Sequence, residues 1–175
     1  MPNWCENTIT ITGTPESLNN FRKTMNTIDT DGNKVEFTFS QTVPQPNNLV
    51  GNGWFEWNIN NWGTKWDVNG DANITIMNDC IIIQVQTAWS PPHAWAENCT
   101  AKFAGLKIKL AFFEIGVGYY GVSTYQDGAE LKSESEHHDI NFDTEYRYDE
   151  ENEDMILAKH IVQFRNKHDI VGYGG

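Results

Sequence analysis

NITIMNDCIIIQVQTAWSPPHAWAENCTAKFAGLKIKLAF, residues 73–112, is the stretch that decides the fold. It begins with two strand patterns joined by Asn78-Asp79, a pair suited to a tight hairpin turn. Ser90 can cap a helix over about residues 91–104, because serine is a favoured N-cap residue. Alternating apolar residues over 106–112 then indicate another strand. The last three of these elements, strand, helix and strand, form the second half of a ferredoxin-like βαββαβ pattern.

The N-terminal part of the chain supplies the first half of this pattern. Isoleucine alternates with threonine over residues 7–13, as in a half-buried strand. Thr14-Pro15-Glu16 matches the start of a helix, which should end near Asp29. Residues 35–39 alternate again and predict the second strand. We therefore expect an α+β fold with a ferredoxin-like core over about residues 1–113.

Three additions to this core are expected. Residues 41–72 form an aromatic-rich insertion, whose large rings must pack against the sheet: Trp54, Phe55, Trp57, Trp62 and Trp66. An extra β-hairpin turns at about residues 126–128, and an acidic segment follows it. A C-terminal helix is predicted over about 149–167, with acids near its N-terminus and bases near its C-terminus. We expect residues 1–175 to form a single domain, with the last two additions in residues 114–175.

Most of the net charge of −12 lies in one segment. Residues 127–154 contain 12 acidic and two basic residues. Such a surface repels the phosphate backbone of DNA and RNA, so we predict no direct nucleic-acid binding. It can attract a basic protein surface, or it can be a solvated hairpin and loop that keeps the protein soluble.

Several classes of protein do not fit the sequence. No segment approaches the ~20 apolar residues of a membrane-spanning helix, and the first residues lack a secretory signal pattern. The three cysteines are widely spaced and the histidines lack metal-binding spacing, which argues against a disulfide framework or a metal site. A G-x-G-x-x-G run at 116–121 precedes a strand pattern, whereas a dinucleotide fingerprint precedes a helix. We expect a cytoplasmic protein of a bacterial host, without a cofactor, a metal or a membrane contact.

Four short stretches carry a resemblance to a known family. They are MPNWCEN at 1–7, NWGTKWD at 61–67, TAWSPP at 87–92 and FAGL at 103–106. Together they resemble the YubB-type ferredoxin-like family of phage and conjugative-plasmid proteins, over residues 1 to about 131. The family often carries Tyr-x-Glu-x-Gly, where this chain has FFEIG at 112–116. The resemblance implies a ferredoxin-like fold and a mobile-element origin, but no established activity and no catalytic residues.

An acidic partner-binding surface is the leading functional hypothesis. The protein would be a non-enzymatic accessory protein of a phage or mobile element that inhibits a host defence system by occupying a basic surface of a host protein. The contact residues would be Asp143, Glu145, Asp149, Glu150, Glu151, Glu153 and Asp154.

A small-molecule site is the alternative. The NWGTKWD stretch can be a structural clasp, with tryptophans in the core and a glycine turn, or it can form a pocket wall. As a pocket wall it would stack on a planar ligand and contact a phosphate, so that the protein sequesters a nucleotide signal. The residues of this predicted site are Trp62, Lys65, Trp66, Trp89 and His93.

An enzyme is the third hypothesis, and it has no motif behind it. Glu114 lies on an apolar strand pattern next to a glycine-rich turn. If it were buried, its pKa would rise and it could act with His93 as an acid–base pair. Solvation at the edge of a sheet is the expected alternative for this carboxylate.

Overall fold

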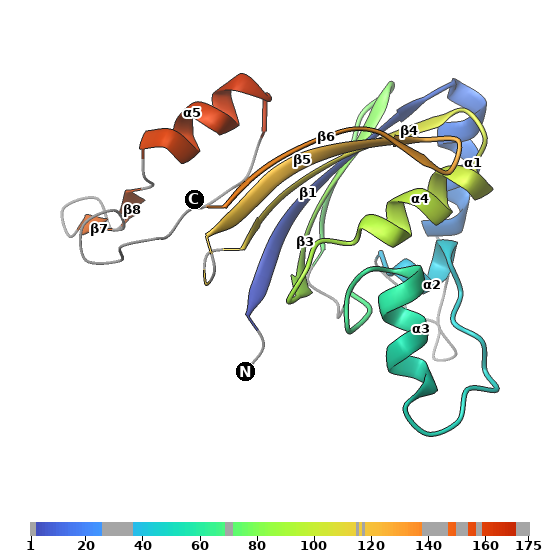
Figure 1. The fold of residues 1–175 in the computed structure, drawn as a ribbon. Coiled ribbons are helices and arrows are strands. Elements are labelled where there is room, and N and C mark those ends of the chain that lie inside the picture. Colours follow the sequence, from blue (N-terminus) through green and yellow to red (C-terminus); the bar gives the residue numbers. More distant parts are fainter. Residues whose placement is uncertain are drawn as a thin grey trace.

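A six-stranded antiparallel sheet forms the centre of the computed structural model (Figure 1). Its spatial order is β2-β3-β1-β4-β5-β6, and each strand pairs antiparallel with its neighbours. The strands are β1 (Trp4–Gly13), β2 (Asn73–Ile76), β3 (Cys80–Ala88), β4 (Leu106–Glu114), β5 (Tyr119–Gln126) and β6 (Ala129–His137). The structure describes residues 3–25, 37–68, 72–114, 116, 118–137, 147–149, 154–156 and 159–170.

The first four strands and two helices form the ferredoxin-like core. In chain order the elements are β1, α1 (Pro15–Met25), β2, β3, α4 (His93–Lys102) and β4. Their spatial order is β2-β3-β1-β4. The two strands of each βαβ unit thus lie on opposite sides of a third, antiparallel strand, as in the ferredoxin-like pattern. This arrangement confirms the predicted fold class.

The second strand of the core is not the predicted one. Phe39 begins the short helix α2 (Phe39–Thr42) instead of ending a strand, and β2 takes the predicted strand's place. The reason is a contact distant in sequence: Asp67 accepts hydrogen bonds from the backbone amides of Phe39 and Ser40, at 2.6 and 3.1 Å. A side chain thus satisfies groups that a neighbouring strand would otherwise bond. Residues 35 and 36 lie outside the described residues.

One face of the sheet is covered by α1 and α4. Ile9 and Ile11 on β1, with their neighbours on β3 and β4, are fully buried against these helices. Phe21 of α1 and Trp95 of α4 are the large side chains that fill this layer. The start of α4 differs slightly from the prediction, because Pro92 occupies the N-cap position and Ser90 bonds elsewhere.

The aromatic-rich insertion lies beside this layer. It contains α2 and α3 (Gly53–Asn61), and Figure 1 shows both below α4, at one end of the sheet. Phe39 and Trp62 are buried, and their ring centroids are 6.1 Å apart. The insertion therefore extends the main core through Trp62, with Trp57 packed beside it. The prediction that all of its large rings pack against the sheet is wrong for Trp66, which is 40 % exposed.

The opposite face of the sheet carries α5 (Lys159–Lys167). Ile161 and Phe164 pack on Phe113 and Tyr120, which point away from the main core. The predicted start of this helix at residue 149 is wrong, because β7 (Arg147–Asp149) and β8 (Asp154–Ile156) pair as a small hairpin before it. Its first turn contains no acidic residue, so the predicted interaction of acids with the helix dipole is absent there.

None of the helices described by the structure combines the length and apolar character needed to cross a membrane.

Candidate functional site

An exposed group of aromatic rings surrounds one lysine at the end of the sheet near the N-terminus. Lys65 Nζ lies 4.4 Å from the ring centroid of Trp89 and 4.7 Å from that of Trp66. Trp4 lies next to Trp66, with ring centroids 6.3 Å apart, and Phe55 lies next to Trp89 at 6.4 Å. These five residues are called the tryptophan–lysine cluster below.

The tryptophans of this cluster are unusually exposed. Trp89 is 48 % exposed, Trp4 45 % and Trp66 40 %. Large aromatic side chains normally contribute to folding by burying their rings, so a group of half-exposed indoles is informative. Contiguous exposed apolar surface of this kind marks interaction sites and ligand sites in soluble proteins.

The backbone beneath the cluster is held by hydrogen bonds between two loops. Thr64 is fully buried, and its hydroxyl donates to the carbonyl of Ala88 at 3.0 Å. The Ser90 hydroxyl donates to the carbonyl of Gly63 at 2.6 Å. The Trp89 amide donates to the carbonyl of Asn3 at 2.9 Å. The three segments that carry Lys65, Trp89 and Trp4 are therefore fixed to one another.

Two positions in these loops have left-handed backbone conformations. Gly63 has φ +83°, and a β-carbon there would lie 3.1 Å from the His93 nitrogen and 3.2 Å from the Pro91 oxygen. Trp89 has φ +76°, which is unusual for a bulky residue. Strained backbone that the surrounding structure maintains is found more often at functional sites.

Trp62 is not part of this exposed surface. It is 2 % exposed, its indole N–H donates to the carbonyl of Val43 at 2.9 Å, and its ring packs edge-on against Trp57. Within the NWGTKWD stretch, Trp62, Gly63 and Asp67 thus act as the structural clasp, whereas Lys65 and Trp66 face outward. The clasp interpretation therefore accounts for Trp62, Gly63 and Asp67, and the pocket-wall interpretation stays a prediction for Lys65 and Trp66.

His93 also lies apart from the cluster. Its ring packs edge-on against Phe112, and its Nδ1 is hydrogen-bonded to the hydroxyl of Tyr125. Because that hydroxyl donates to Glu130 at 3.0 Å, Nδ1 of His93 acts as the donor to Tyr125. Burial lowers the pKa of His93, and the charge of Glu130 opposes this effect. The side chain of His93 therefore packs between α4 and the sheet, where it contacts Tyr125 and Phe112.

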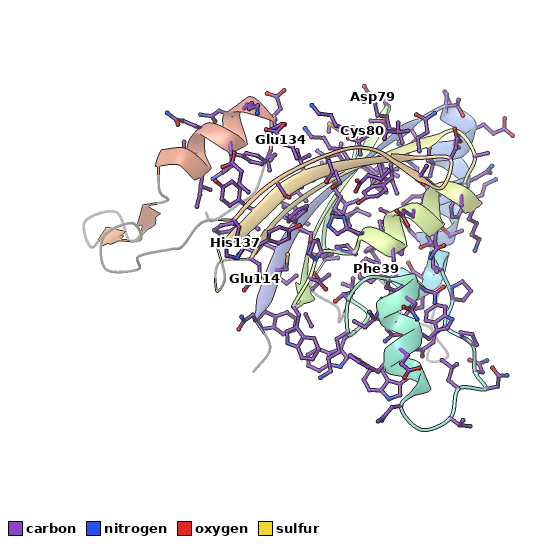
Figure 2. The ribbon with its side chains drawn as sticks, in the orientation of Figure 1. Phe39, Asp79, Cys80, Glu114, Glu134 and His137 are labelled. Atoms are coloured by element: carbon purple, nitrogen blue, oxygen red, sulfur yellow. The ribbon has the colours of Figure 1, made fainter. Side chains whose placement is uncertain are left out.

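Glu114 is buried, so its expected solvation at the sheet edge is wrong. It is 2 % exposed at the end of β4, in register with Cys5 of β1. Figure 2 labels Glu114 at this end of the sheet. Its carboxylate accepts a hydrogen bond from the Gly116 amide at 3.0 Å, in the turn that leads to β5. The structure therefore gives this carboxylate a role in holding a turn.

Two of the seven predicted acidic contact residues lie in the small sheet of β7 and β8, and five lie outside the described residues. Asp149 ends β7 and Asp154 begins β8, and the two residues are paired in register. The others, Asp143, Glu145, Glu150, Glu151 and Glu153, lie outside the described residues.

Potential metal ligands do not gather in the part of the chain that the structure describes. No group of three or more histidine, cysteine, aspartate or glutamate side chains there could hold a metal ion.

Sequence reasoning missed two members of the cluster, Trp4 and Phe55. Trp4 lies in one of the stretches that carry the family resemblance, and Phe55 was expected only as a packing residue. Neither position has a local pattern that marks it as a site residue. Their proximity to Trp66 and Trp89 arises from the pairing of β1 with β3 and from the position of α3.

Sheet order and helix placement define an α+β protein of the ferredoxin-like class. More specifically, the chain belongs to the family of ferredoxin-like domains in Api92-like proteins, DUF1281_C, whose model matches residues 61–158. The fold is also similar to the crystal structure of a protein api92 from Yersinia pseudotuberculosis, with a TM-score of 0.59 and 8 % identity. That match covers 80 % of this chain and 100 % of the other. No curated protein matches the chain significantly.

Proposed function

We propose that the protein is a non-enzymatic binding protein that takes up a nucleotide at the tryptophan–lysine cluster. The observation that carries this proposal is the position of the Lys65 ammonium between two half-exposed indoles, 4.4 and 4.7 Å from their centroids. Indoles stack on nucleobases, and an ammonium group pairs with a phosphate. The cluster thus offers both chemical features of a nucleotide ligand on one surface.

Preorganisation strengthens this proposal. Hydrogen bonds of Thr64 and Ser90 hold the two loops together before any ligand arrives. A surface that does not need ordering loses less conformational entropy on binding. The strained backbone of Trp89 is consistent with selection for the orientation of its ring rather than for stability.

The biological setting is part of the same proposal. The resemblance to YubB-type proteins supports an origin in a phage or plasmid. A small protein of such an element that sequesters a nucleotide would deprive a host defence system of its signal. This role needs binding alone and no catalytic group.

Intrinsic tryptophan fluorescence tests the proposal directly. We expect nucleotides to quench the emission of the wild-type protein in a saturable titration, because the exposed indoles would stack on the base. Trp89→Ala and Lys65→Ala should each weaken binding at least tenfold, whereas Leu131→Ala should not. Leu131 is the matched control, since it is exposed on β6, away from the cluster. A panel of mono-, di- and cyclic nucleotides that leaves the emission unchanged would refute the proposal.

A second candidate function rests on the charge distribution. Residues 127–154 carry 12 acids against two bases, which suits a basic surface on a host protein. In this proposal the protein is a counter-defence inhibitor that contacts its target through residues 143–154.

Charge reversal distinguishes this second candidate. Replacing the seven acidic contact residues by lysine should abolish binding to the host target recovered with the wild-type protein, and raised salt should weaken wild-type binding. Trp89→Ala should leave that interaction intact. Binding that survives the charge reversal would exclude the acidic segment as the contact surface.

A further inference from the structure

The tryptophan–lysine cluster places one cation, Lys65, between two indole rings, those of Trp66 and Trp89. Lys65 Nζ is within 4.7 Å of the ring centroids of both Trp66 and Trp89. Trp66 and Trp89 are each at least 40 % exposed as residues. The order ring, ammonium, ring matches the order base, phosphate, base in a dinucleotide, where one phosphodiester separates two planar groups.

The cluster offers little to a longer strand. Trp4 and Phe55 extend the row of rings at its two ends, but Lys65 is the one cation that belongs to it among the described residues. Glu56 follows Phe55 in α3 and is exposed, so further phosphates at that end would meet a negative charge. The protein as a whole carries a net charge of −12. Binding of long single strands needs a positively charged track along the backbone of the strand.

We infer that the ligand of the cluster is a dinucleotide, with one base on Trp66, one base on Trp89 and the connecting phosphodiester on Lys65. This inference rests on the proposed function and specifies its ligand. Trp4 and Phe55 support the two indoles from outside, through the 6.3 and 6.4 Å ring contacts. The rigid connection between the two loops fixes the spacing of the two stacking surfaces.

The test compares ligands that differ by one base. Adenosine monophosphate has one base and one phosphate, ApA has two bases and one phosphodiester, and the tetranucleotide A4 extends the strand. We expect ApA to bind about tenfold or more tightly than adenosine monophosphate, since it stacks a second base on a second indole. A4 should bind within a fewfold of ApA, because it has only more registers for the same site.

Variants assign the two bases. Trp66→Ala and Trp89→Ala should each reduce the affinity for ApA to about that for adenosine monophosphate. Lys65→Ala should weaken the binding of both ApA and adenosine monophosphate and remove most of the salt dependence of their affinities. Lys107→Ala is the matched control, since Lys107 is exposed on β4 outside the cluster, and it should change neither. Thermal unfolding of each variant by circular dichroism verifies that it is folded.

Two outcomes would overturn the inference that the ligand is a dinucleotide and would leave the proposed nucleotide binding intact. Equal affinities for adenosine monophosphate and ApA would mean that the site takes one base. An affinity for A4 that exceeds that for ApA by tenfold or more would indicate a single-strand binding surface. If no ligand of the series bound, both this inference and the proposed function would fall.

Discussion

Replacing Trp89 by glycine should give a more stable protein than replacing it by alanine. Both variants lose the same indole and its contacts with Lys65 and Phe55, so their difference isolates the backbone. At φ +76° a β-carbon is strained, by roughly 1–2 kcal/mol for an L-residue. Glycine avoids this strain but loses about 0.5–1 kcal/mol through the greater freedom of its unfolded chain. The difference between these two free energies favours glycine by up to about 1.5 kcal/mol, and by roughly 0.7 kcal/mol at their midpoints.

Urea and thermal unfolding measure this difference. In a chain of this size, about 1 kcal/mol corresponds to a shift of roughly 2–4 °C in Tm. Val50 is the matched control, because it is 85 % exposed in a loop and is not among the described non-glycine residues with positive φ. At Val50 the order should reverse, with alanine more stable than glycine.

The reasoning would be refuted if Trp89→Gly were less stable than Trp89→Ala by the amount seen at Val50. That result would mean that the backbone of Trp89 is not strained. Nucleotide binding adds a second comparison, since both variants should weaken it by the same factor. Equal binding by two variants of different stability would show that the indole carries the binding and that the backbone strain affects stability alone.

Three further predictions concern the loops and buried groups. Gly63→Ala should destabilise the protein by about 1–3 kcal/mol in urea unfolding, because Gly63 has a φ of +83° and the new β-carbon would lie close to the His93 nitrogen. Gly53→Ala is the control and should be neutral or stabilising, because its nearest contact is at 3.9 Å. Equal effects of the two substitutions would contradict the conformation of Gly63. Because burial lowers the pKa of His93 in the folded protein, this histidine binds a proton more readily in the unfolded chain, where its pKa is about 6.5. As the pH falls, protonation of His93 therefore favours the unfolded state. The free energy of unfolding should therefore decrease below about pH 6.5, and His93→Gln should lose less stability than the wild type over that range; parallel pH profiles would argue against this. Burial raises the pKa of the Cys5 and Cys99 thiols, whereas Cys80 is only partly buried. Mass spectrometry should therefore find that iodoacetamide labels only Cys80 in the native protein and all three cysteines in urea. Labelling of Cys99 in the native protein would contradict its burial.

The strands that the sequence predicted well share strong alternation. Residues 7–13 and 106–112 alternate over their whole length, and the structure places both in the centre of the sheet. Alternation is a local property, because side chains of successive strand residues point to opposite faces. The prediction failed at Phe39, where the pattern is short and the distant carboxylate of Asp67 bonds the backbone.

The two ends of the predicted C-terminal helix show the same difference. Its last turn, with Arg165 and Lys167, was placed correctly. Its start was placed ten residues too early, because acids near Asp149 resemble a helix N-terminus. In the structure β7 pairs with β8 there, and an acidic N-terminal pattern cannot distinguish a helix from a hairpin.

The candidate site was predicted in part. Lys65, Trp66 and Trp89 were named from the sequence, and the structure brings them together. Trp62 and His93 were named with them, but Trp62 is buried and the ring of His93 bonds Tyr125. Composition identifies tryptophans as candidates, yet burial alone separates a core indole from a surface one.

The amino-acid sequence by itself determined the fold class, because periodicity, turn residues and helix starts act over a few residues. Only the tertiary structure decided which aromatic rings face solvent and which lie together. Trp4, Lys65 and Trp89 come from three segments that are joined by pairing between β1 and β3 and by the hydrogen bonds of Thr64 and Ser90. These contacts link residues far apart in the chain, and their formation depends on the whole sheet being assembled.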